Sequence, residues 1–333
     1  MVKKLIITSL AVLIIASGIM SAALAGQEDK QIRLINFING NLGDKSFFDS
    51  ANRGLSRAEK EFGLDARTVE AGNNSSRWRS VLDNATSRGD YDILVAGTFD
   101  MTSIIQNESL KHPDKKIIFY DGSVNYSAAN YSNVYSILFK QNEGSYLVGV
   151  YAALMSRSGI IGAIGGMDNP TINDFIAGYE QGARSARPNI TVITRYGGSF
   201  DNITAGKKIA REIYGQGADI IFQISGAMGQ GVFQAALEEG KYAIGVDSDQ
   251  ASIINQTSPE EARVILTSMM KNVDNSLYRA IKLYLEGSLP FGHSERLGIR
   301  EGGVGLARNK IYNESTPADI KAKVDAVEME LRG

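Results

Sequence analysis

Cysteine is absent from all 333 residues of the chain. Its absence excludes disulfides, thiolate metal sites and thiol catalysis. It also excludes a lipid anchor, because lipid is attached to a cysteine just after the signal of an exported lipoprotein. Histidine is almost as scarce, since only His112 and His293 occur. Each lies next to a proline or glycine turn, so we expect solvated rather than catalytic roles.

A basic excess is missing as well, because the formal net charge is −2. No positive field is therefore available to attract nucleic acid. After residue 25, no apolar run approaches the roughly 20 residues of a membrane span. Six prolines leave no proline-rich linker, while 43% hydrophobic and 22% charged residues are typical of an ordinary globular protein. A chain of this length can bury a core that needs no disulfide.

The N-terminus has the three parts of a secretory signal. Residues 1–4 form a short basic segment with Lys3 and Lys4, and residues 5–20 are almost wholly apolar. Residues 21–25 then supply small residues, with Ala23 and Ala25 at the positions that a signal peptidase reads. A retained membrane anchor is less favoured, since it usually needs a longer apolar run. We expect cleavage after Ala25 and a periplasmic protein that does not span the membrane.

Short apolar runs alternate with longer amphipathic ones along the rest of the chain. In residues 47–62, for example, apolar side chains recur at helical spacing and Gly63 follows. The alternation of strand-like and helix-like segments starts a second time near Val134, and it is too long for a single sheet. Such alternation predicts parallel sheets covered on both faces, arranged here as two doubly wound α/β lobes. The expected strands are residues 32–38, 91–96, 116–120, 159–165, 191–194, 219–223 and 242–246.

Polar corners follow these strands, and ligands of doubly wound sheets sit beyond the carboxyl ends of the strands. The first corner offers Asn41, Asp44 and Ser46, followed by the paired aromatics Phe47 and Phe48. Asp44 or Ser46 could equally cap the helix that begins near Phe47. Five further corners are rich in Gly, Asp, Asn and Ser. They contribute Phe99, Asp121, Asp168, Gly226 with Met228, and Asp247.

This composition predicts a cleft for hydroxyl and amide groups. Carboxylates that accept two hydrogen bonds suit vicinal hydroxyls of a sugar, and aromatic rings or methionine suit a flat base. Enzyme signatures are missing: there is no phosphate-binding loop and no nucleophile elbow, and residues 226–231 have the wrong spacing for a dinucleotide loop. Binding without catalysis is therefore favoured, with no cofactor and no metal site.

Two other classes of protein stay open. Paired carboxylates among Asp121, Asp168, Asp247 and Asp249 would suit a periplasmic nucleoside hydrolase. A sensory receptor that signals to a membrane kinase would present the same kind of cleft. Trp78, the single tryptophan, is expected to pack in the core or on the surface rather than to stack on a ligand.

Seven motifs follow one another along the chain: residues 43–47, 144–153, 162–166, 178–183, 231–236, 245–250 and 265–271. This ordered set resembles the basic membrane protein family of ABC-transporter substrate-binding proteins. The match extends over essentially the whole chain after the signal, and the family includes purine-nucleoside receptors.

The resemblance implies a type I periplasmic-binding fold with a three-segment hinge. Its lobes would be residues 30–137 plus 270–297 and residues 138–269 plus 298–333. A nucleoside, with a purine preferred, would bind between them, and the partner would be an inner-membrane permease.

The same resemblance implies roles for particular residues. Asp44 and either Phe47 or Phe48 would contact the base, Asp247 and Lys271 the ribose, and Asp121 would face the cleft. The run 47–49 departs from the Phe-Asn typical of the family, so riboflavin or another flat heterocycle is the rival ligand. The full expected ligand-binding set is Asn41, Asp44, Lys45, Ser46, Phe47, Phe48, Phe99, Asp121, Asp168, Gly226, Met228, Asp247 and Lys271.

Overall fold

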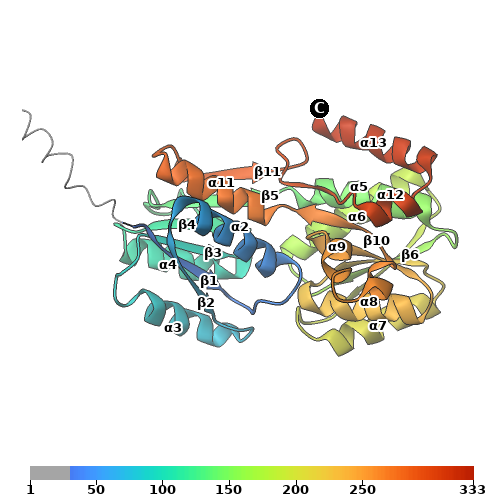
Figure 1. Cartoon of the computed structure of the whole chain (residues 1–333), viewed down its shortest axis with the longest axis horizontal. Helices are drawn as coiled ribbons and strands as arrows, with labels where there is room; N and C mark the ends of the chain where they lie inside the picture. The colour runs from blue at the N-terminus through green and yellow to red at the C-terminus, as the bar shows by residue number, and fades with distance from the viewer. Residues whose placement is uncertain (1–30) are drawn as a thin grey trace, which may run out of the picture.

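The computed structural model describes residues 31–333, in which two six-stranded sheets form two lobes side by side (Figure 1). The predicted signal, residues 1–25, lies outside the described residues. Every described strand pairing is parallel except that of β12, which runs antiparallel to β10. Helices alternate with the strands, which confirms the predicted class of two doubly wound α/β lobes.

The first sheet has the strand order β11-β5-β4-β3-β1-β2. Its strands are β1 (Arg33–Ile38), β2 (Asp65–Glu70), β3 (Ile93–Gly97), β4 (Lys116–Tyr120), β5 (Val134–Phe139) and β11 (His293–Leu297). The helices of this lobe are α2 (Phe47–Phe62), α3 (Ser75–Thr86), α4 (Thr102–Lys111) and α11 (Val273–Leu285), with the short 3₁₀ turn η1 (Phe99–Met101) before α4.

The second sheet has the order β12-β10-β9-β8-β6-β7. Its strands are β6 (Ile160–Gly165), β7 (Thr191–Tyr196), β8 (Ile220–Ile224), β9 (Tyr242–Asp247), β10 (Ile265–Lys271) and β12 (Val304–Leu306). The helical elements of this lobe are α5 (Gln141–Met155), α6 (Pro170–Ala186), α7 (Ile203–Gly215), η2 (Gly226–Met228), α8 (Gly229–Glu238), α9 (Gln250–Ile254), α10 (Pro259–Ala262), α12 (Lys310–Ser315) and α13 (Ala318–Arg332).

The chain passes between the two sheets three times, after β5, after β10 and after β11. These strands lie at or next to one edge of their sheets, so the three connections form a hinge along that edge. In Figure 1 the helices α3 and α7 lie at the bottom of the two lobes, on the side away from these connections. The interlobe space therefore has a hinge end and a far end.

Helix α2 shows how local sequence produces these elements. Ala51, Leu55 and Ala58 recur on one face and are buried, and Gly63 ends the helix in the left-handed region with φ 67°. Gly54 lets the backbone of α11 approach closely, because a Cβ there would lie 2.3 Å from the carbonyl oxygen of Asp274. None of the helices within residues 31–333 is both long and apolar enough to cross a bilayer.

Candidate functional site

A cavity of about 800 Å³ lies between the lobes and is lined by residues from both. It is built from corners at the carboxyl ends of the strands, where parallel sheets expose backbone groups and loop side chains. The order of the strands in the two sheets determines the order in which these corners lie along the cavity. Corners of β4, β9 and β10 lie towards the hinge, and corners of β2, β6 and β7 lie at the far end.

The hinge end holds a buried ion pair. Lys271, at the end of β10, is 1% exposed, and its Nζ lies 2.6 Å from Oδ1 of Asp121, which follows β4. Three aromatic rings surround the same ammonium group. The Phe47, Phe139 and Phe175 ring centroids lie 5.3, 5.2 and 5.2 Å from Nζ. The rings and the carboxylate stabilise the buried charge that the loss of water would otherwise penalise.

Asp247 lies beside this pair at the end of β9 and is also buried. Ser46 Oγ, from the other lobe, donates a hydrogen bond of 2.5 Å to Asp247 Oδ2. Burial raises the pKa of Asp247 to about 6, and the opposing effects of Lys271 and Ser46 are smaller. The hinge end therefore presents two carboxylates and one ammonium group in a region that water hardly reaches.

The loop after β1 is held rigid by its own carboxylates. Asp44 accepts hydrogen bonds from the backbone N–H groups of Ser46, Phe48 and Asp49 at 2.9, 2.8 and 3.1 Å. Asp49 in turn accepts from the N–H groups of Gly43 and Lys45, both at 2.8 Å. Asp44 therefore caps the first turn of α2 while it also lines the cavity. Burial raises its pKa, although the three N–H groups favour the charged form.

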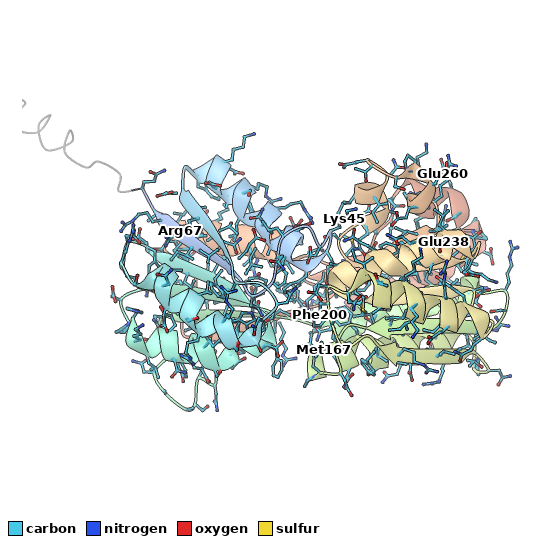
Figure 2. The ribbon with its side chains drawn as sticks, turned by 90° about the horizontal axis from the view of Figure 1, so that it is seen from below. Lys45, Arg67, Met167, Phe200, Glu238 and Glu260 are labelled. Carbon is cyan, nitrogen blue, oxygen red and sulfur yellow. The ribbon has the colours of Figure 1, made fainter. Side chains whose placement is uncertain are left out.

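The far end of the cavity is aromatic and apolar. Trp78 and Phe99 come from the first lobe, and Met167 and Phe200 from the second. Figure 2, which views the molecule from the side of α3 and α7, shows Met167 and Phe200 at the junction between the lobes. The buried charges therefore lie at the hinge end, whereas more exposed aromatic and apolar side chains lie towards the far end.

A polar bridge crosses between the lobes at the far end. Asn73, which follows β2, donates a side-chain hydrogen bond to Asp201, which follows β7. Ser199 donates to the other carboxylate oxygen of Asp201, and its Oγ accepts from the Asp201 N–H at 3.0 Å. All three residues line the cavity. The bridge links the two lobes at the end of the cavity that lies opposite the hinge.

Backbone strain collects around the same site. Among residues 31–333, the non-glycine residues with positive φ are Lys45, Thr98, Asp121 and Asp247, at 55°, 73°, 56° and 63°. Each lies in a corner after a cleft strand, and Thr98 is β-branched, for which this conformation is especially unfavourable. Strained backbone persists where the surrounding structure fixes it, and it clusters at ligand sites.

Nine of the thirteen residues expected to contact ligand line the cavity. They are Asn41, Asp44, Phe47, Phe48, Phe99, Asp121, Gly226, Asp247 and Lys271. Both Phe47 and Phe48 contribute, with their ring centroids 5.3 Å apart in a T-shaped arrangement.

Four expected residues lie outside the lining. Ser46 is buried behind Asp247, and Lys45 offers its carbonyl oxygen to Gln250 Nε2 at 3.2 Å. Asp168 is exposed and accepts from Asn173 Nδ2 at 2.9 Å. Met228 is fully buried, with its sulfur close to Gly197.

Other lining residues were missed by sequence reasoning. The corner after β7, with Gly198, Ser199, Phe200 and Asp201, has the same glycine-rich pattern as the six corners that were recognised. It escaped notice because the strand was expected to end at Thr194, whereas β7 continues to Tyr196. Trp78 packs against the core of its lobe, as expected, and also lines the cavity.

Comparisons with known proteins agree with this architecture. Residues 32–330 match the model of the family described as ABC transporter substrate-binding protein PnrA-like. Basic membrane protein B of Borrelia garinii subsp. bavariensis is 33% identical over 307 residues, covering 89% of this chain and 88% of its own. The CD4+ T-cell-stimulating antigen of Listeria monocytogenes is 28% identical and covers 94% and 92%.

A solved structure gives the same result. An ABC transporter solute-binding protein of Aeropyrum pernix K1 superposes with a TM-score of 0.79 at 26% identity, covering 90% of this chain and 91% of its own. The fold and the interlobe site define a solute-binding protein of an ABC transporter. The chain belongs to the PnrA-like basic membrane protein family, which confirms the resemblance seen in its motifs.

Proposed function

We propose that this protein is the periplasmic component of an ABC importer and binds a nucleoside, with a purine preferred, between its lobes. The observation that carries the proposal is that the buried charges gather at the hinge end of the cavity, while more exposed aromatic and apolar side chains line it towards the far end. A nucleoside has the same division, since a polyhydroxylated sugar is joined to a flat base.

The ribose is assigned to the hinge end. Ionised Asp121 and Asp247 can accept hydrogen bonds from vicinal hydroxyls, and Lys271 can donate to a sugar oxygen. Because these groups are buried, each hydrogen bond to the ligand is electrostatically stronger than it would be in water. Lys271 and Ser46 each engage one oxygen of these carboxylates, so a ligand with several hydroxyls can satisfy their remaining acceptor capacity.

The base is assigned to the space between Phe48 and Phe200. These rings come from different lobes and both line the cavity. A ligand held between them contacts both lobes, so it stabilises the closed arrangement over the open one. Closure would then present the loaded protein to its permease in the inner membrane.

A thermal-shift screen of the purified protein against nucleosides, free bases, sugars and flavins tests the proposal. A ligand that binds only the folded state adds about 2.7 kcal/mol of stability at a hundredfold excess over its dissociation constant. We expect a large shift with adenosine, guanosine or inosine and little with ribose or free base. A thermal shift with riboflavin alone would support the proposed binding role but would show that the ligand is a flavin and not a nucleoside.

The variant Asp247→Ala assigns the site. It should abolish the nucleoside shift while its melting temperature without ligand shows that it still folds. Unchanged nucleoside affinity in this variant would remove Asp247 from the site. Release of free base during incubation would instead indicate a nucleoside hydrolase.

A further inference from the structure

The far end of the cavity is also lined by apolar side chains other than Phe48 and Phe200. Four further apolar side chains line it: Trp78 from α3, Phe99 from the corner after β3, Ile104 from α4, and Met167 from the corner after β6. We refer to these four residues as the outer compartment. Figure 2 shows Met167 on the second lobe, facing the gap between the lobes.

These side chains are exposed at an energetic cost. Phe99 is 45% exposed and Met167 39% exposed. Burial of apolar surface contributes about 25 cal/mol of stability per Å², and exposed apolar surface does not make this contribution. Apolar side chains that gather in a hollow on the surface therefore indicate a site of ligand contact. Trp78 and Ile104 are partly buried against the core of their lobe, so this wall is firmly supported.

The compartment offers few free polar groups to an occupant. The indole Nε1–H of Trp78 already donates to the carbonyl oxygen of Gly72 at 2.7 Å. The hydroxyl of Thr98, next to Phe99, accepts a hydrogen bond from Asn39 Nδ2 at 2.8 Å. The four side chains of the compartment themselves offer ring face, aliphatic surface and the thioether of Met167. Asp100 lines the cavity from the same corner, and its charge disfavours an anionic occupant.

The space is also large enough for more than a nucleoside. Pockets of roughly 300–1,000 Å³ bury most of a drug-sized ligand, and a nucleoside is smaller than most such ligands. This cavity, at about 800 Å³, is towards the upper part of that range. The bridge between Asn73 and Asp201 crosses between the lobes at the same end of the cavity.

We propose that the outer compartment binds an uncharged apolar substituent, preferably an aromatic ring, carried by the base of the nucleoside. This inference rests on the proposed function. With the ribose at the hinge end, the edge of a purine that bears positions 2 and 6 is directed towards the far end. A group attached to the exocyclic nitrogen at position 6 would therefore enter the compartment.

Calorimetric titration with three compounds tests the inference: adenosine, N6-benzyladenosine and 5′-O-benzyladenosine. We expect the N6-benzyl compound to bind at least about tenfold more tightly than adenosine, equivalent to about 1.4 kcal/mol. The 5′-O-benzyl compound carries the same ring at the opposite end, against Lys271 and the carboxylates, and should bind more weakly than adenosine.

A pair of variants on one helix locates the effect. Ile104→Ala removes part of the compartment wall. It should reduce severalfold the preference of the protein for N6-benzyladenosine over adenosine. Leu110→Ala is the matched control, because Leu110 lies on α4 as well but is 51% exposed and does not line the cavity. It should leave this preference as in the wild type.

The possible failures are distinguishable. If adenosine binds and the N6-benzyl compound binds no more tightly, the outer compartment is overturned and the proposed function stands. If Ile104→Ala does not change the ratio of the affinities for N6-benzyladenosine and adenosine, the assignment of the benzyl group to the outer compartment is also overturned. If neither compound binds and no nucleoside gives a thermal shift, the proposed function fails together with the inference.

Discussion

Lys271 Nζ lies 2.6 Å from Asp121 Oδ1, and this ion pair joins the end of β10 in one lobe to the end of β4 in the other. The Lys271 side chain is 2% exposed and that of Asp121 is 13% exposed. Sequence separation between the two residues is 150 positions, so only the folding of both sheets brings them together. The pair lies next to the hinge and forms the charged end of the cavity.

Removing one member of this pair should destabilise the protein. In Lys271→Met, Asp121 keeps a largely buried charge without its partner, and breaking a buried pair in this way costs about 3–5 kcal/mol. Chemical denaturation monitored by circular dichroism should show the loss in the free energy of unfolding. The double variant Lys271→Met with Asp121→Asn removes both charges, and asparagine tolerates the positive φ of this position. It should recover much of the stability but no nucleoside affinity. A single variant that unfolds like the wild type would show that the pair is dispensable.

The raised pKa of Asp247 predicts a specific dependence of stability on pH. An unfolded aspartate ionises near 3.8, whereas burial raises the folded pKa to about 6. Between these values the folded state holds more protons, so the contribution of this group to the free energy of unfolding falls as pH rises through the window. Relative to the wild type, Asp247→Asn should therefore gain free energy of unfolding as the pH rises from 4 to 6. A difference that is constant with pH would contradict this assignment.

Ligand affinity should follow the same ionisation in the opposite direction. In the proposed complex, ionised Asp247 would accept hydrogen bonds from the hydroxyls of the ribose, whereas the protonated form loses acceptor capacity. Nucleoside affinity should therefore rise as pH increases from 5 to 7, since the pKa is about 6. Calorimetry at several pH values measures this, and Asp247→Asn, which does not ionise, should bind weakly at every pH. A wild-type affinity that is flat over this range would exclude an ionised Asp247 as the acceptor.

The bridge between Asn73 and Asp201 should slow ligand release. Asp201→Ala removes the bond that crosses the far end of the cavity, so we expect the dissociation rate to rise severalfold with little change in melting temperature. Trp78 lines the cavity and is the single tryptophan, so stopped-flow fluorescence can follow release. Asp168→Ala is the control, because this exposed carboxylate bonds only within its own lobe, to Asn173. Equal rates in the two variants would argue against a role for the bridge.

Asp44 should prove important for the fold of the loop as well as for the ligand. Its carboxylate accepts three backbone N–H groups at the start of α2, and loss of a cap typically costs about 1–2 kcal/mol. Asp44→Ala should therefore lower the free energy of unfolding even without ligand. Ser56→Ala, an exposed substitution on the same helix, provides the comparison. An unfolding curve for Asp44→Ala that overlays the wild type would leave the cap without an energetic role.

The sequence alone determined the architecture and most corners of the cavity. Alternating short apolar runs and amphipathic segments placed β1, α2, β4 and β9 closely, because side-chain periodicity and glycine stops are local properties. Ordered family motifs added the type I fold and the interlobe position of the site. Strand-end corners could be recognised because a polar, glycine-rich segment after an apolar run is visible without any tertiary contact.

Tertiary structure decided which side chain of each corner points into the cavity. Met228 and Gly226 belong to the same corner, yet Gly226 lines the cavity and Met228 lies in the core. Similarly, only the approach of the two lobes joins Asn73 to Asp201, residues separated by 128 positions. Orientation within a corner depends on φ and ψ of one or two residues, and interlobe contacts depend on the packing of both sheets. Neither is a local property, so the sequence pattern could not determine them.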